Sequence, residues 1–582
     1  MQLLSPLRQH RATAAVCALL LTFALLKLYS LNFVLGDEHM YFYMSLLVSR
    51  GDWPYRDFFF SHPPLQLYVM APLYKVFGYS LALSKSVPSL AALVSGLHVY
   101  LIGKRMVGRL EGVLAMAMFL FTYDILRGSS HFTGANCVLA FGLGATYQAL
   151  AGRQIAAGVL FAIATLTGIY IAPLALMLAV LLVFRAWKES LRLLVAFATT
   201  CLVLGAIFVG AAGWHAFWYQ IFDYNLHKIA FRHSWFDKLR NVAYLNSLVM
   251  SGFVPGIAWA TSMWLLRGRE RCAPTLPGKL GRIGSWLNLW SGDRIASQMI
   301  FATLICGYFY FYSTRVDYYS YYFMLIMPWM GLMTATVVAD VVRYLLARRT
   351  TPSAPEPQGT RAERRREQKR RRRERPQSPG HERWRAWPVV VFAMCIGFLL
   401  LYRRGIGSDR QKDMGDHVRQ YVWRDSPRLP HFLNRLVAAT FWKPTSDPVH
   451  PPNAVTYYLQ HESLSAGSAE GFVAAVRSVC RPGERIFGEY SLGPFAAALG
   501  PCVLAANLAD TNPHRWKVHE SRPADWVNAL EKDHLDVAIV VPGTTMMREP
   551  VMRDYLTTTF PRTVATWDDR YAGRVELRRR AP

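Results

Sequence analysis

Two adjacent carboxylates follow the first long apolar run of the sequence. The run covers residues 13–35, and Gly36-Asp37-Glu38-His39 comes directly after it. A carboxylate at the edge of a membrane, partly removed from water, can take a proton from a hydroxyl or an amine and act as a general base. Asp and Glu are also common at a helix start, where they stabilise its positive end. The pair predicts either a catalytic base or the start of a helix at the membrane surface.

Aromatic and basic residues continue the same stretch. Gly51-Asp52-Trp53-Pro54-Tyr55-Arg56-Asp57 is followed by Ser61-His62-Pro63-Pro64-Leu65, and Lys85 lies near the start of the next apolar run. A basic side chain at this level can stabilise negative charge on a phosphate leaving group, and the alternative for each is contact with lipid headgroups. His62 has two interpretations of equal weight, as a donor to phosphate or as a polar residue at the start of an interfacial helix.

The composition excludes a single soluble domain. Of the 582 residues, 52% are hydrophobic and 18% are charged, against about 25% charged in an ordinary soluble domain. The net charge of +27 comes partly from an Arg-rich run at 361–375. This run has almost no apolar residues, which predicts a disordered cytoplasmic loop near anionic headgroups. Nucleic-acid binding is disfavoured, because the run carries no recognition motif and no interleaved aromatic residues.

Apolar runs long enough to cross a bilayer recur along the chain. After the first, they lie near residues 81–103, 110–125, 134–150, 155–184, 193–212, 242–266, 296–313, 319–346 and 387–402. The run at 155–184 is interrupted by Gly168 and Pro173 and has basic residues at both ends, which predicts a hairpin of two short spans. The expected fold is a polytopic α-helical membrane protein with about eleven transmembrane helices.

The distribution of Lys and Arg predicts the orientation. The loops that alternate with the amino-terminus hold more Lys and Arg than the opposite loops, which places the amino-terminus in the cytoplasm. The expected organisation is a transmembrane region at 1–346 with a first outer loop at 36–80, a cytoplasmic loop at 347–386, a last helix at 387–402 and an extracytoplasmic domain at 403–582. The expected location is a bacterial inner (plasma) membrane.

The carboxyl-terminal domain shows an α/β pattern. Short apolar strands are predicted at 485–488, 503–506 and 537–541, alternating with helices near 468–479, 524–534 and 547–559. No Gly-x-Gly-x-x-Gly motif opens these helices, so nucleotide binding has no support. Cys480 and Cys502 are the two cysteines of this domain. In an oxidising compartment they can pair if their geometry allows it, and otherwise they are two buried thiols.

The order of these motifs resembles the amino-terminal part of the GT-C glycosyltransferases, with the protein O-mannosyltransferases and the lipid A aminoarabinose transferases as the nearest relatives. The resemblance is strongest over residues 13–150, extends as topology to about 346, and covers nothing specific in the carboxyl-terminal domain. It implies a first outer loop that lies on the membrane as amphipathic helices. It also implies that Asp37 activates the acceptor that attacks a polyprenyl-phosphate sugar, with Glu38 beside it and Lys85 as a basic residue near the phosphate.

Further residues are candidates for substrate contact. Many relatives place a second acid at the head of the fourth span, where this chain has Asn136. An amide can orient Asp37 or bind a sugar hydroxyl, but it cannot share a proton with Asp37 or hold a divalent ion well. If a second acid is needed, it has to be Asp124. Candidates that supply positive charge at the outer surface are Arg56, Lys228, Arg232 and Arg315, and Lys27 lies unusually within the first span.

These observations predict an inverting glycosyltransferase that moves a single sugar, a hexose or a pentose, from a polyprenyl-phosphate donor. The acceptor is a lipid, a glycan or a protein on the outer side of the membrane. No cofactor or metal is implied, because Arg and Lys alone can hold a monophosphate. The alternative is a transporter or flippase of lipid-linked saccharides. Transporters usually show internal repeats, and the sequence shows no such duplication.

Overall fold

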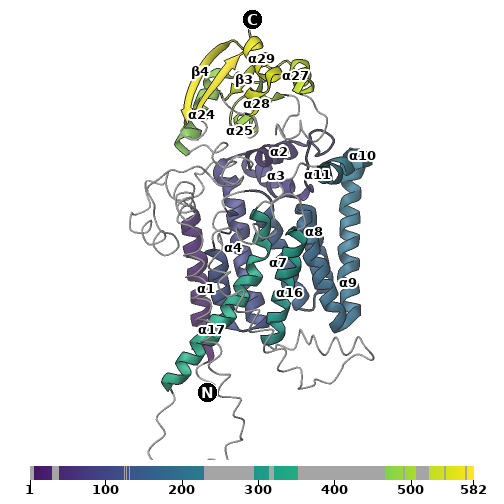
Figure 1. Cartoon of the computed structure of the whole chain (residues 1–582), viewed down its shortest axis with the longest axis vertical. Coiled ribbons are helices and arrows are strands. Elements are labelled where there is room, and N and C mark those ends of the chain that lie inside the picture. The colour runs from purple at the N-terminus through teal and green to yellow at the C-terminus, as the bar shows by residue number, and fades with distance from the viewer. Residues whose placement is uncertain are drawn as a thin grey trace, which may run out of the picture.

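The structure is a computed structural model that describes part of the chain. The described residues are 5–28, 38–122, 125, 128–129, 132–227, 294–313, 320–350, 466–488, 492–505, 523–542, 545–569 and 573–582. The predicted spans at 242–266 and 387–402 and the Arg-rich run at 361–375 lie outside them. The described helices of the first part form a bundle, and a carboxyl-terminal α/β region lies at one end of this bundle (Figure 1).

Apolar helices make up the bundle. The helices are α1 (Ser5–Leu28), α4 (Leu81–Met106), α5 (Arg109–Leu120), α7 (Ala135–Leu150), α8 (Gln154–Thr167), α9 (Ala172–Ala212), α16 (Arg294–Ser313) and α17 (Met327–Thr350). Within the described ranges, three segments are long and apolar enough to cross a membrane: Leu81–Met106, Trp187–Ala212 and Phe323–Asp340. Four shorter apolar helical segments accompany them, at His10–Leu25, Gln154–Thr167, Ile169–Leu181 and Ile300–Phe309.

The break predicted within the 155–184 run lies at Gly168. Helix α8 ends at Thr167, and a short 3₁₀ turn, η3 (Ile169–Ile171), leads into α9. The chain reverses again within α9, because the Ser190 hydroxyl donates a 2.8 Å hydrogen bond to the Ala179 carbonyl. In a straight helix these two residues would be separated by about 16 Å, since each residue adds about 1.5 Å of rise.

The loop between α1 and α4 contains two helices at the end of the bundle that faces the α/β region (Figure 1). These are α2 (Glu38–Arg50) and α3 (Leu65–Phe77), which pack against each other. A tight turn follows α2, with Gly51 at φ 107° and Tyr55 at φ 70°. The strained backbone of Tyr55 is held by two hydrogen bonds, from its N–H to the Phe58 carbonyl at 3.0 Å and from its hydroxyl to the His62 carbonyl at 2.7 Å.

The carboxyl-terminal region is a mixed sheet covered by helices. The sheet order is β2-β1-β3-β5-β4, with β1 parallel to β2 and β3, and β5 antiparallel to β3 and β4. The strands are β1 (Arg485–Gly488), β2 (Val503–Leu504), β3 (Val537–Val540), β4 (Arg562–Asp569) and β5 (Gly573–Arg579). The helices are α24 (Ala466–Val479), α25 (Leu492–Leu499), α27 (Pro523–Lys532), α28 (Thr545–Arg548) and α29 (Pro550–Thr559).

These elements confirm the α/β pattern and the three predicted strands. The hairpin of β4 and β5 and the helix α25 were not predicted. The hairpin alternates apolar and charged side chains, as in Arg574-Val575-Glu576-Leu577-Arg578. This alternation is typical of a sheet with one solvated face, and it contains no apolar run of the kind by which β1, β2 and β3 were recognised.

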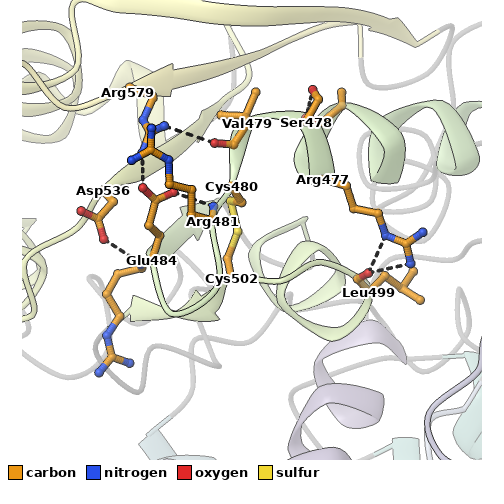
Figure 2. Close-up of a disulfide and its surroundings, with 12 residues drawn as sticks. Arg477, Ser478, Val479, Cys480, Arg481, Glu484, Leu499, Cys502, Asp536 and Arg579 are labelled. Atoms are coloured by element: carbon orange, nitrogen blue, oxygen red, sulfur yellow. Dashed lines mark hydrogen bonds and ion pairs between the residues drawn. A yellow bond between two sulfur atoms is a disulfide. The ribbon is translucent and has the colours of Figure 1, made fainter.

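Cys480 and Cys502 form a disulfide that joins the end of α24 to the start of β2 (Figure 2). Their Cα atoms are 5.8 Å apart, and 22 residues separate them in the sequence. A crosslink that closes a loop of this length stabilises a fold by about 3 kcal/mol, because it restricts the unfolded chain. Arg579 reinforces the same corner by donating hydrogen bonds to the Val479 carbonyl and to the Glu484 carboxylate (Figure 2). Of the two interpretations that the sequence allowed for these cysteines, the structure contains the paired one.

Candidate functional site

A buried ion pair between Glu38 and Lys85 lies where the first loop meets the bundle. Glu38 begins α2, and Lys85 lies in the second turn of α4, whose first turn is capped by Ser80. Both side chains are 0% exposed and the two charged groups are in contact. The second carboxylate oxygen of Glu38 accepts a hydrogen bond of 3.1 Å from the Phe132 N–H. Buried charges persist only when they are paired and hydrogen-bonded, so these contacts hold Glu38 of α2 against α4.

Asp37, the predicted base, lies outside the described residues. It is joined by a peptide bond to Glu38, the first residue of α2. Glu38 therefore identifies the region of the fold to which the predicted acid pair belongs, and the role of Asp37 remains a prediction.

Lys27 brings a second positive charge to this end of the bundle. It lies in the last turn of α1 and is 4% exposed, with its Nζ atom 5.5 Å from the centre of the Phe23 ring. Lys27 and Lys85 thus place two buried basic side chains at this end of the bundle. Snorkelling to headgroups, the alternative interpretation of Lys27, does not fit a side chain that is buried within the protein.

Two tyrosines add neutral hydroxyl groups near Glu38. The Tyr74 hydroxyl lies 2.6 Å from the Ser84 hydroxyl, and the Tyr79 ring lies 5.2 Å from the Tyr74 ring. Burial raises the pKa of Tyr74, and the negative charge of Glu38 acts in the same direction. Burial likewise raises the pKa of Tyr79 well above its ordinary value. Both phenols therefore remain protonated and can donate hydrogen bonds. Sequence reasoning missed them, because nothing in their spacing sets them apart from other interfacial aromatics.

Asn136, predicted to contact substrate, lies in the first turn of α7 and is 2% exposed. Its Nδ2 group donates a 2.5 Å hydrogen bond to the Gly128 carbonyl. The Ser89 hydroxyl donates to the neighbouring Ser129 carbonyl at 2.8 Å. Both bonds hold Gly128 and Ser129, a few residues before Phe132, whose N–H donates to Glu38. Asn136 thus supports the Glu38 environment, and its contact with substrate remains a prediction.

Arg56 and His62 occupy different surroundings. Arg56 is about half-exposed and forms an ion pair of 2.8 Å with Asp57, which also accepts a 2.7 Å hydrogen bond from the Trp53 N–H. The hydrogen bond from Arg56 lowers the pKa of the Asp57 carboxyl. The Nε2 atom of His62 lies 3.0 Å from the hydroxyl of Tyr41 on α2. Within the described contacts, His62 is therefore linked to the helix that Glu38 begins, whereas Arg56 stabilises its own turn.

A distant segment holds the first loop in place. Gln220, in the π-helical turn η4 (Tyr219–Asp223), accepts a 2.8 Å hydrogen bond from the Phe60 N–H and donates a 3.0 Å bond to the Tyr55 carbonyl. Asn225, in α11 (Tyr224–His227), donates a 2.7 Å bond to the Ser61 carbonyl. Single π-helical turns often occur at functional sites. Sequence reasoning missed both residues, because about 160 positions separate them from the loop.

The other predicted contact residues are not described by the structure. These are Asp124, Lys228, Arg232 and Arg315, and their roles remain predictions. Among the residues that the structure does describe, no three His, Cys, Asp or Glu side chains are grouped so that they could hold a metal ion. The described part of the site thus contains one carboxylate, two buried lysines and neutral hydroxyl donors. Such a set can hold an anionic group beside an acid.

Comparisons with known proteins concern the family and the fold. The model of glycosyltransferase family 87 matches residues 59–275. The crystal structure of ArnT from Cupriavidus metallidurans in the apo state has 17% identity and a TM-score of 0.54, and the match covers 98% of this chain and 98% of that chain. The structure of ArnT bound to undecaprenyl phosphate has 16% identity and a TM-score of 0.52, covering 97% and 98%. No curated protein matches the sequence.

The comparison with ArnT extends the similarity beyond what the motifs covered. It spans the carboxyl-terminal region as well as the helical bundle, whereas the sequence motifs ended near residue 346. Together with the match to glycosyltransferase family 87, the shared fold confirms the resemblance to the GT-C superfamily and supports a membrane glycosyltransferase.

Proposed function

We propose that this protein is an inverting glycosyltransferase that moves one sugar from a polyprenyl-phosphate donor to an acceptor on the outer side of the membrane, with Asp37 as the general base. The observation that carries the proposal is the buried ion pair of Glu38 and Lys85. It anchors the residue that follows Asp37 among buried positive charges. An acid needed only to cap a surface helix would not require a fully desolvated partner on another helix.

The reaction requires little covalent chemistry from the protein. The acceptor oxygen or nitrogen attacks the anomeric carbon on the face opposite the phosphate, and Asp37 takes its proton. The new bond forms while the bond between the anomeric carbon and the phosphate oxygen breaks, and the electron pair leaves with the lipid phosphate. In this proposal, Lys85 and Lys27 stabilise the charge that grows on the phosphate, because both are buried basic side chains at this end of the bundle. Alignment and charge stabilisation are the main contributions expected of the site.

The donor class rests on a specific comparison. ArnT, whose fold this chain shares over nearly its whole length, was crystallised with undecaprenyl phosphate. A polyprenyl-phosphate sugar is a donor that a buried lysine near the membrane edge can accommodate, because a lysine binds phosphate as a point charge. The sugar is a hexose or a pentose, and the acceptor is a lipid, a glycan or a protein.

Two features support an outer location for the site. The carboxyl-terminal region contacts α2 directly and contains the disulfide of Cys480 and Cys502. Disulfides persist in oxidising compartments such as the bacterial periplasm. The helices α2 and α3 of the first loop and the carboxyl-terminal region lie at the same end of the bundle (Figure 1). This arrangement fits a chain of about eleven spans with a cytoplasmic amino-terminus in the inner membrane.

The proposal is tested by reconstituting the full-length protein in liposomes with a panel of radiolabelled polyprenyl-phosphate sugars and cell-envelope acceptors. The wild type is expected to transfer the label. Asp37→Asn should lower kcat by about 10²–10⁴-fold, the usual contribution of a general base. Asp52→Asn is the matched control, because it removes a carboxylate from the same loop, and it should retain activity.

The same liposomes separate the enzyme from a transporter or flippase. The lipid-linked label is added to one leaflet, and its appearance in the other leaflet is measured alongside transfer to acceptor. Movement of intact donor by both the wild type and Asp37→Asn, without transfer by either, would contradict the proposal.

A further inference from the structure

Helix α2 is enclosed by contacts on three of its faces. Glu38 and Phe42 are one turn apart and both contact Phe132, through the hydrogen bond to its N–H and a stacked ring contact at 5.7 Å. A second face carries Tyr41, whose hydroxyl contacts His62. The third face carries His39 and Tyr43, again one turn apart. This third face points towards the carboxyl-terminal region rather than towards the bundle.

The contacts of the third face come from two elements of the α/β region. The ring of Phe495 in α25 lies 4.3 Å from the ring of His39, and both side chains are at most 2% exposed. The Leu504 N–H in β2 donates a hydrogen bond of 3.4 Å to the Tyr43 hydroxyl. Leu504 follows Cys502 by two residues, so the disulfide anchors the strand that makes this contact.

An unbroken row of aromatic rings runs from the sheet to the site. Within the carboxyl-terminal region, Trp567 lies 5.4 Å from Phe472, and Phe472 is stacked 6.0 Å from Phe495. From Phe495 the row continues through His39, and His39 lies 5.9 Å from Phe42, which is stacked on Phe132. The first loop and one face of the sheet accordingly share a single hydrophobic core. Interiors packed in this way transmit displacements rather than absorb them.

From these contacts we propose that the carboxyl-terminal domain is a positioning element of the transfer site, with Phe495 as the positioning residue that holds α2, and through it the Asp37 and Glu38 pair, in the reactive arrangement. The inference rests on the proposed function and assigns a role to a domain whose role the motifs left open. Phe495 contacts neither donor nor acceptor. It acts through His39, which directly follows Glu38 in the chain.

The test compares two phenylalanines of the same domain. Phe495→Ala removes the contact with His39. Phe560→Ala is the matched control, because Phe560 is 0% exposed but belongs to the separate core on the other side of the sheet, formed with α27 and α29. Both variants are made in the full-length protein and reconstituted as above. Phe495→Leu, which keeps an apolar side chain of nearly the same size, serves if Phe495→Ala does not fold.

Phe495→Ala is expected to lower kcat about tenfold or more while the KM for the donor changes less than about twofold, since small displacements of reacting groups cost rate rather than binding. The kcat of Phe495→Leu should lie between that of Phe495→Ala and that of the wild type. Phe560→Ala should keep the kcat of its folded fraction. Equal losses of kcat in Phe495→Ala and Phe560→Ala would overturn the inference, because they would indicate a general loss of domain stability.

A second measurement does not depend on transfer activity. Amide hydrogen exchange of Glu38–Arg50 in the resting protein reports directly on α2. Exchange should become about tenfold faster in Phe495→Ala and remain unchanged in Phe560→Ala. Unchanged exchange of α2 in Phe495→Ala would also overturn the inference. If no sugar is transferred at all, the proposed function fails, and the exchange result still decides whether the domain holds α2.

Discussion

Two ion pairs of the first loop region differ in how far they are removed from water. Glu38 and Lys85 are 0% exposed and connect α2 to α4. Arg56 and Asp57 are 51% and 31% exposed and are neighbours in one turn. Sequence reasoning treated both basic residues as candidates for phosphate contact. The structure distinguishes them, because only Lys85 is paired with a buried carboxylate on another element, next to the predicted base.

Burial changes what such a pair contributes. An exposed pair gains little, because water and salt screen its charges. A fully buried pair leaves an uncompensated charge when one partner is removed, and the cost of breaking it is therefore large. A third pair lies between these extremes. Glu111 in α5 is 0% exposed, but its partner Arg343 in α17 is 43% exposed, at an N–O distance of 2.6 Å. The three pairs therefore differ stepwise in how far their charged groups are exposed to water.

The largest effect is expected for Lys85→Met. This substitution leaves the Glu38 carboxylate buried without its ammonium partner, which should destabilise the protein by about 3–5 kcal/mol and abolish transfer. Thermal unfolding in detergent and the transfer assay measure the two effects. Lys75→Met is the matched control, because Lys75 is an exposed residue of α3.

The double variant Glu38→Gln and Lys85→Met sharpens this prediction. Removing both charges should recover a large part of the lost stability, because no charge of the pair is then left buried. Transfer should remain absent in the double variant, since the phosphate has lost its cation. A double variant as unstable as Lys85→Met would contradict the importance assigned to the ion pair.

An intermediate effect is expected for Arg343→Gln at the other end of the bundle. The substitution removes one charged partner of buried Glu111, but Arg343 is partly in water, so the loss should be about 1–2 kcal/mol. The kcat for transfer should be unchanged, because Glu111 lies just after the carboxyl end of α4, whereas Lys85 lies near its amino end. Thermal unfolding and the transfer assay check both statements. A loss of stability as large as that of Lys85→Met would contradict the proposal that the cost of removing one partner depends on the burial of the pair.

The smallest effect is expected for Arg56→Ala. Because the side chain is half-exposed, the Tm at neutral pH should fall only slightly. This small difference from the wild type should disappear in acid. Arg56 lowers the pKa of Asp57 below its ordinary value of 3.8. The stabilisation is therefore fully present above pH 3.8 and disappears as the pH falls through the lowered pKa.

Unfolding measured between about pH 5 and 2 tests this prediction. The wild type should lose stability more steeply than Arg56→Ala in the acid part of this range. Asp57→Asn should behave like Arg56→Ala. Identical acid profiles of wild type and Arg56→Ala would show that the pair has no effect on Asp57.

Local signals were sufficient for much of the fold. The α/β pattern of the carboxyl-terminal region and the strands β1, β2 and β3 followed from short apolar runs. Gly168 marked the break in the 155–184 run. The motifs from Asp37 to Lys85 led to the GT-C resemblance that the comparisons confirmed. The span count and the orientation remain predictions. The described residues contain three segments that are long and apolar enough to cross a membrane. The β4–β5 hairpin was missed, since its alternating side chains left no apolar run.

Tertiary structure decided the contacts between segments far apart in the chain. Lys85 and Asn136 had been predicted to contact substrate, but nothing local indicates that Lys85 is buried against Glu38 or that Asn136 anchors the segment beside it. The sequence likewise gives no indication that Phe495 contacts His39. The physical reason is that hydropathy and capping act over a few residues, whereas the value of a buried charge or ring depends on which distant groups exclude water from it.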